Sequence, residues 1–133
     1  MKIKTKNLSY DEVMKLPSWE HKKPKKPSAL LAGVARLLLN GELKKVDFKY
    51  DQIDMEKAGD GPWMILMNHC SFTDLSIAFK VLKGRPFSIV CTSDALVGKE
   101  WLMRSLGCIP TRKFVSDLSL ISDMDYALNV NKA

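Results

Sequence analysis

His69 and Asp74 are the two residues whose types and spacing could support proton transfer, and they closely follow the apolar run Trp63–Met67. A carboxylate that accepts a hydrogen bond from one imidazole nitrogen fixes the tautomer, and the other nitrogen can then take a proton from a substrate hydroxyl. This arrangement is the base and its orienting group of a catalytic triad, with a substrate alcohol as the nucleophile. The structural alternative is that both residues cap the following helix, and spacing alone favours that simpler interpretation.

The elements that would position this pair follow from the hydrophobic pattern, which alternates short apolar runs with stretches of helical period. We expect strands at Leu43–Tyr50, Trp63–Met67, Phe87–Cys91 and Cys108–Thr111, and helices at Ser28–Gly41, Thr73–Leu82, Lys99–Leu106 and Asp117–Asn131. This alternation predicts an α/β fold, with a mainly parallel sheet flanked by helices. Ligands bind at the carboxyl ends of such strands, where His69 is expected.

Length and composition limit the class of protein. The chain has 133 residues, 46% of them hydrophobic and 27% charged, which suits one soluble globular domain and excludes a wholly disordered chain. The longest stretch without a charged residue, Gly61–Thr73, is shorter than a membrane-spanning helix of roughly 17–25 residues. The start of the chain has no apolar core, so we expect no signal peptide.

The formal net charge of +6 is concentrated at the start of the chain. Residues 1–49 carry a net +7 and residues 50–133 a net −1, so we divide the chain into a basic N-terminal segment, 1–42, and an α/β portion, 43–133. The densest basic cluster contains Lys22, Lys23, Lys25 and Lys26 and precedes the apolar helix at Ser28–Gly41. A solvated linker and a contact with phosphates both fit the cluster, and a membrane-surface anchor and a buried core helix both fit the apolar stretch.

Other site classes find less support. Cys70, Cys91 and Cys108 have no CxxC spacing, and an odd count without a signal peptide favours reduced thiols in a cytoplasmic protein. His21 and His69 are the only histidines and lack paired ligands at metal-binding spacing, so no metal site is expected. The basic cluster has no interleaved aromatic residues, and therefore no nucleic-acid partner is expected.

Two motifs together resemble the glycerolipid acyltransferase family of 1-acylglycerol-3-phosphate and lysophospholipid acyltransferases. Asn68-His69-(x)4-Asp74, between an apolar strand and an apolar helix, is similar to the first signature block of that family. Leu106–Lys113, with Gly107 and Arg112, resembles the second block, and the separation of the blocks is also similar. The resemblance covers roughly residues 60–115.

The resemblance implies a reaction and a set of roles. His69 would deprotonate the hydroxyl of a lysophospholipid or glycerol phosphate, whose oxygen attacks the thioester of acyl-CoA or acyl-carrier protein. Asp74 would orient His69, while Gly107, Arg112 and Lys113 would form the substrate-binding block, with a basic side chain on the acceptor phosphate. No metal or prosthetic group is implied, because the acyl donor is a co-substrate. The expected location is cytoplasmic, peripheral on the inner face of a membrane with anionic lipids.

The sequence also departs from the family pattern. The family arginine usually stands at the position of Lys113, and Asp94 stands near a position where members often have a lysine. The later Glu-Gly-Thr-Arg-like block does not occur before Ala133. We therefore expect an incomplete domain, the N-terminal part of an acyltransferase, with little or no transfer activity on its own. The alternative is a non-catalytic membrane- or phosphate-binding module that retains the fold.

Overall fold

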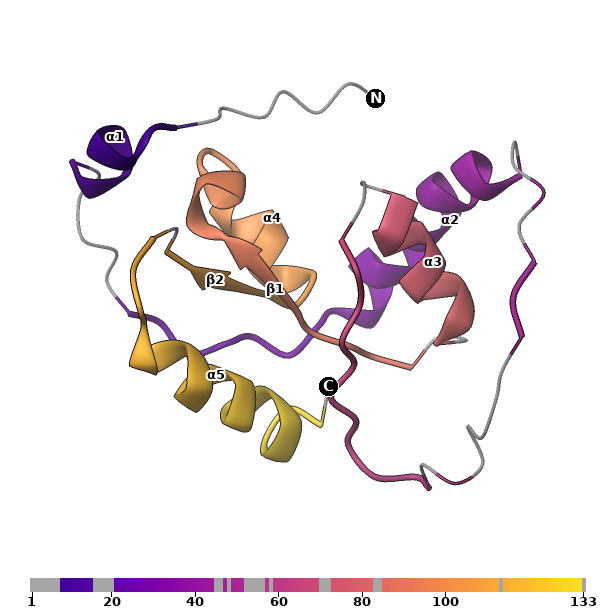
Figure 1. Ribbon diagram of the computed structural model, residues 1–133. Coiled ribbons are helices and arrows are strands. Elements are labelled where there is room, and N and C mark those ends of the chain that lie inside the picture. Colours follow the sequence, from indigo (N-terminus) through magenta and orange to yellow (C-terminus); the bar gives the residue numbers. More distant parts are fainter. Residues whose placement is uncertain are drawn as a thin grey trace. The chain divides into compact units, whose positions relative to one another are not determined.

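The computed structural model describes residues 8–15, 21–44, 47, 49–51, 57, 59–69, 73–82, 85–112 and 114–132 (Figure 1). The chain forms two compact units, and each is described by itself. Unit 1 contains Met1–Pro27 and Phe87–Ala133, and unit 2 contains Ser28–Pro86. This grouping differs from the predicted segments 1–42 and 43–133, because the N-terminal residues and the C-terminal half share one unit.

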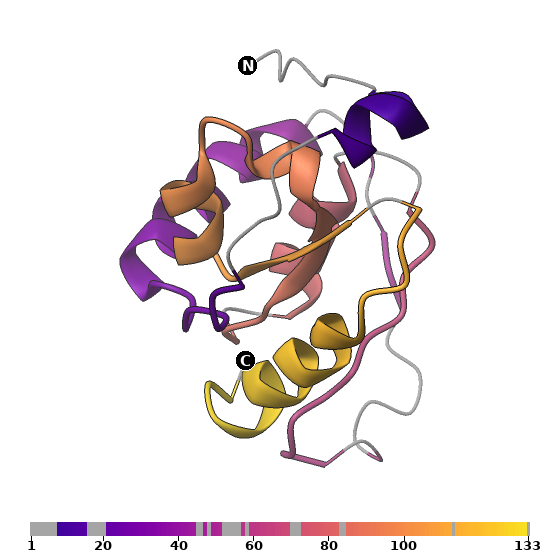
Figure 2. The ribbon, with the colours of Figure 1, turned by 90° about the vertical axis from the view of Figure 1, so that its left-hand side faces the viewer.

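Unit 1 is a mixed α and β structure around a two-stranded parallel sheet. Its elements are α1 (Tyr10–Met14), β1 (Ile89–Thr92), the 3-10 helix η2 (Ser93–Leu96), α4 (Glu100–Ser105), β2 (Cys108–Thr111) and α5 (Leu118–Asn129). The register pairs Ile89 with Cys108 and Thr92 with Thr111. The chain crosses from β1 to β2 through η2 and α4, and α4 and α5 lie on opposite sides of the strands (Figures 1 and 2).

The core of unit 1 lies between these elements. Leu96 is fully buried, and Ile109 and Ala127 are nearly so. Gly107 ends α4 with a φ of 91°, a left-handed conformation that glycine adopts without the steric cost of a Cβ atom. A Cβ at this position would lie 2.7 Å from the Cγ of Pro27 and 2.9 Å from the carbonyl oxygen of Phe87. Glycine is therefore required here both for its backbone angle and for space.

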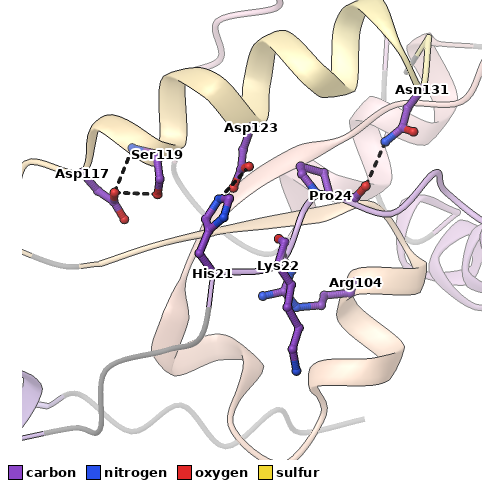
Figure 3. A network of polar contacts seen from close by, with 8 residues as sticks. All are labelled: His21, Lys22, Pro24, Arg104, Asp117, Ser119, Asp123 and Asn131. Atoms are coloured by element: carbon purple, nitrogen blue, oxygen red, sulfur yellow. Dashed lines mark hydrogen bonds and ion pairs between the residues drawn. The ribbon is translucent and has the colours of Figure 1, made fainter.

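Residues 21–27, named here the N-terminal strap, pack into unit 1 along α4, β2 and α5 (Figure 3). Arg104 donates from Nη1 to the carbonyl oxygen of Lys22 at 3.1 Å. Asn131 donates from Nδ2 to the carbonyl oxygen of Pro24 at 3.2 Å. Pro24 and Pro27 are buried, whereas the four strap lysines are exposed. The backbone and prolines of this basic cluster thus belong to the packed structure, and its charges face solvent.

Unit 2 contains two packed helices, α2 (Ala29–Leu43) and α3 (Thr73–Val81). Its buried side chains come from both helices and the turn after α3, namely Leu43, Ser76, Ala78 and Leu82. The rest of α2 is far more open, since Leu37 exposes 76% of its surface and Leu30 and Leu38 are similarly exposed. In the described ranges, no helix combines the length and apolar character needed to cross a bilayer.

Most predicted helices are confirmed with small shifts at their ends. Ser28 caps α2, accepting from the backbone N–H of Leu31 at 3.5 Å, and Asp117 caps α5, accepting from the N–H of Ser119 at 3.0 Å. The expected stop at Gly41 is wrong, because α2 continues to Leu43. A glycine inside a helix lowers helix stability by only about 1 kcal/mol relative to alanine, so a helix can continue through it when the residues that follow favour helix formation.

The strand predictions are confirmed only in the C-terminal half. Phe87–Cys91 and Cys108–Thr111 correspond to β1 and β2. Trp63–Met67 was expected to be a buried strand, but it is extended without strand pairing, and Leu66 is 88% exposed. An apolar run forms a buried strand only where neighbouring strands take up its N–H and C=O groups, and the described residues of unit 2 form no strand that could do so. The expected strand Leu43–Tyr50 begins inside α2 and lies partly outside the described residues.

Two of the cysteines meet across the sheet. Cys91 on β1 and Cys108 on β2 are both free thiols. The hydrogen bond between them, followed by burial, raises the pKa of Cys91, and the same hydrogen bond lowers the pKa of Cys108. Cys70 lies outside the described residues.

Candidate functional site

His69 and Asp74 are in contact, as their spacing predicts. His69 Nδ1 and Asp74 Oδ2 lie 2.8 Å apart. The histidine side chain is 83% exposed and the aspartate side chain 18% exposed. Among the described residues, no other hydrogen-bond partner of the imidazole is found, so Nε2 is open to solvent. The arrangement can orient an imidazole and leave one nitrogen accessible to a hydroxyl group.

Local structure explains how the pair forms. His69 ends an extended stretch, and Asp74 lies in the first turn of α3, where a carboxylate is favoured by the helix dipole. Asp74 lies next to the N-terminus of α3, and from there its carboxylate reaches the imidazole of His69. The contact spans five residues, so little chain entropy is lost when it forms.

The remaining sequence-predicted site residues belong to the second motif. Gly107 makes the left-handed turn between α4 and β2, against Pro27. Arg112 follows β2 and lines a pocket of about 260 Å³ in unit 1. Lys113 lies outside the described residues.

This pocket opens at the carboxyl ends of the two strands of unit 1. Ser93 follows β1, Thr111 ends β2, and Asp117 and Ser119 begin α5, all of them on its lining. Hydrogen bonds from Ser119 hold the pKa of Asp117 below its usual value, and the charges of Arg112 and His21 act in the same direction. The position agrees with the rule that open parallel sheets bind ligands at their carboxyl edge.

Sequence reasoning missed three ionisable residues that line the same pocket, His21, Arg104 and Asp123. His21 Nε2 lies 3.0 Å from Asp123 Oδ1, forming a second His–Asp pair (Figure 3). Arg104 donates from Nε to Glu100 at 3.0 Å. The spacing of Glu100 and Arg104 resembles that of an ordinary exposed helix pair, and no local signal relates residues 21 and 123.

A metal centre finds no support in the part of the chain that the structure describes. Within those ranges, no group of three or more His, Cys, Asp or Glu side chains could hold a metal ion. No protein-family model, curated protein or solved structure matches this chain.

Proposed function

We propose that the protein is an O-acyltransferase, or the N-terminal part of one, in which His69 is the general base and Asp74 its orienting residue. The observation that carries the proposal is the 2.8 Å contact between His69 Nδ1 and Asp74 Oδ2, with the opposite edge of the imidazole exposed. The resemblance of both motifs to glycerolipid acyltransferases supports the choice of reaction. A mainly parallel sheet, larger than the two described strands and flanked by helices, is part of this proposal.

The proposed reaction needs no nucleophile from the protein. His69 Nε2 removes the proton from the hydroxyl of a lysophospholipid or glycerol phosphate, and the oxygen attacks the thioester carbonyl of the acyl donor. The carbon–sulfur bond breaks and an ester forms, and the sulfur of CoA or carrier protein takes the proton from the His69 imidazolium and leaves as the free thiol. Asp74 keeps the Nδ1 hydrogen on its own side and stabilises the imidazolium that forms.

The test is acyl transfer from acyl-CoA to lysophosphatidic acid, followed by release of free thiol at high protein concentration. Residues 1–133 are expected to transfer little or nothing on their own, and any transfer that is detected should fall by about a hundredfold or more in His69→Ala, because general-base catalysis contributes typically 10²–10⁴-fold. Asp60→Asn removes an exposed carboxylate of the same unit, ion-paired at 3.6 Å with Arg85, and serves as the matched control. Transfer detected at equal rates in wild type and His69→Ala would contradict the proposal.

A second candidate is a non-catalytic module that binds a membrane surface, at the cytoplasmic face. The observation that favours it is the exposed row Leu30, Leu37 and Leu38 on α2, close in sequence to the exposed lysines of the strap. Apolar side chains can enter the acyl boundary while lysines contact anionic headgroups.

Vesicle co-sedimentation tests this candidate. Binding to anionic vesicles should weaken with salt, and it should weaken when Leu37 and Leu38 are both replaced by serine. The matched control is Leu118→Ser, which changes an exposed leucine of unit 1. No binding to anionic vesicles at low salt would exclude the membrane module.

A further inference from the structure

The extended stretch that ends at His69 is also held at its beginning, at Trp63. The Cζ atom of Arg85 lies 4.1 Å from the centroid of the Trp63 ring, which is a cation–π contact. Arg85 follows α3 in the chain, so this contact joins the segment after the helix to the stretch that precedes the helix. Residues 63–69, named here the extended run, are thus tied to the helical segment near both of their ends.

The two contacts lie at opposite ends of α3. His69 meets Asp74 in the first turn of the helix, whereas Trp63 meets Arg85 beyond its last turn. The extended run spans roughly 20 Å at about 3.3 Å per residue. The nine residues of α3 span roughly 13 Å at about 1.5 Å per residue. A turn follows the helix, closed by a 2.9 Å hydrogen bond from the Arg85 N–H to the Leu82 carbonyl oxygen, and the lengths are therefore compatible with contacts at both ends.

Proline restricts the backbone beside both residues of this contact. Pro62 precedes Trp63, and Pro86 follows Arg85. Proline locks its own φ at about −65° and disfavours helical conformation in the residue before it. Arg85 is therefore kept from continuing the helix, and its side chain is available to the ring. Asp60 lies 3.6 Å from Nη2 of Arg85, but its carboxylate is fully exposed, so this ion pair adds little to the stacking.

The direction of the extended run depends on its ends because little else holds it. The four apolar side chains from Met64 to Met67 are each at least 48% exposed. In the part of unit 2 that the structure describes, the run pairs with no strand. The His69 side chain is itself 83% exposed. A segment with so little burial is oriented by its end contacts, so a change at Trp63 alters the position from which His69 meets Asp74.

We propose that Arg85, through its stacking on Trp63, is a positioning residue for the His69–Asp74 pair. Arg85 fixes the start of the extended run, and the run then presents Nδ1 of His69 to the Asp74 carboxylate. The inference deepens the proposed function and rests on it for the catalytic meaning of the pair. Arg85 and Trp63 both lie outside the two sequence motifs, and their contact joins residues 22 positions apart.

The tautomer of His69 tests this role without any substrate. A carboxylate that accepts from Nδ1 favours the Nδ1–H form of the neutral ring, and long-range proton–nitrogen NMR correlations at alkaline pH distinguish it from the Nε2–H form. Signals that disappear in His69→Ala identify the ring. Arg85→Gln and Trp63→Leu should each lower the ratio of Nδ1–H to Nε2–H by about two- to fivefold, because a contact biases an equilibrium by no more than its own free energy.

Further variants isolate the stacking itself. If the two side chains act through each other, Arg85→Gln combined with Trp63→Leu lowers the ratio no further than either single change. Trp63→Phe keeps a smaller aromatic ring, so its ratio should lie between those of wild type and Trp63→Leu. Asp60→Asn removes only the exposed ion partner, and Arg36→Gln removes an arginine of α2. Both are matched controls and should give the wild-type ratio.

A purely structural role for Arg85 predicts a different result. The thermal unfolding midpoint of Arg85→Gln would then fall while the His69 tautomer ratio of the folded protein stays at the wild-type value, and this would overturn the proposal. A wild-type ratio no higher than that of Asp74→Ala would also overturn it. The proposed function fails separately: acyl transfer that is independent of His69 contradicts the reaction, whereas an unchanged ratio in Arg85→Gln contradicts only the positioning role.

Discussion

The two His–Asp pairs of this chain use the same side chains at very different separations along the chain. His69 and Asp74 are five residues apart, and the histidine is largely in solvent. His21 and Asp123 are 102 residues apart, and the aspartate is almost completely buried. The local pair orients a ring and leaves one nitrogen accessible, whereas the distant pair joins the strap to α5. Residue type therefore does not decide the role of such a pair, and the separation of its two members along the chain does.

The largest expected effect tests the local pair by its chemistry. Asp74→Asn keeps the shape of the side chain but removes the charge that supports an imidazolium, so transfer should fall by about a hundredfold or more. Its free energy of unfolding should fall by no more than about 1 kcal/mol, the usual effect of one carboxylate in a helical first turn. Thiol release and urea unfolding measure the two quantities. If Asp74→Asn loses much stability but keeps its transfer rate, the local pair is structural rather than catalytic.

The second prediction tests how the strap that carries His21 packs, and it leaves His21 and Asp123 unchanged. Gly107→Ala places a Cβ 2.7 Å from Pro27 and 2.9 Å from the Phe87 carbonyl, at a positive φ. Left-handed strain of roughly 1–2 kcal/mol plus the clash should lower the free energy of unfolding by at least about 2 kcal/mol. Gly98→Ala is the matched control, because its φ is +73° but nothing lies within 4 Å of the new atom. If chemical denaturation shows the same loss in free energy of unfolding for Gly107→Ala and Gly98→Ala, Pro27 does not pack closely against Gly107.

A direct change to the distant pair should have a smaller effect. Asp123→Ala removes the carboxylate that holds His21, and we expect the free energy of unfolding to fall by about 1–3 kcal/mol. Asp125→Ala, on the exposed side of the same helix, removes only a 2.7 Å contact with Asn129 and should cost about 0.2–0.5 kcal/mol. Urea titrations of both variants measure this difference, and equal losses would mean that the buried pair adds nothing beyond an exposed one.

The smallest effect depends on pH. The pKa of Asp117 is lowered in the folded state, so its ionised form stabilises α5 above the unfolded value of about 3.9 and loses this contribution as pH falls through the lower folded value. Asp117→Ala should be less stable than wild type by about 0.5–2 kcal/mol near neutral pH. The difference should shrink below about pH 4. If the difference in urea midpoint between wild type and Asp117→Ala stays constant from neutral pH to below about pH 4, the ionised Asp117 carboxylate does not stabilise α5.

The features that could be predicted from the sequence are those that depend on residues close together in the chain. The ends of α5 and α4 follow from Asp117 and Gly107, and the contact of His69 with Asp74 follows from a short segment before a helix. The catalytic and binding roles of these residues stay predictions.

The remainder depends on long-range packing. The strap has the composition of a solvated linker because its lysines face solvent, while its buried parts are prolines and carbonyl groups that no charge pattern reveals. The apolar run Trp63–Met67 fails as a strand for a related reason, because strand formation requires partners that the run itself does not supply.

The position of the strap also has a consequence for synthesis. Its partners Arg104, Asp123 and Asn131 follow it by 82, 102 and 107 residues. At a translation rate of roughly 5–20 residues per second, the strap waits about 5–20 seconds outside the ribosome before it can dock. Lysines and prolines are the residues that keep a waiting segment from pairing with strands of neighbouring nascent chains. We therefore expect the basic composition of residues 21–27 to disfavour such pairing before folding, and the folded unit places those same lysines on its surface.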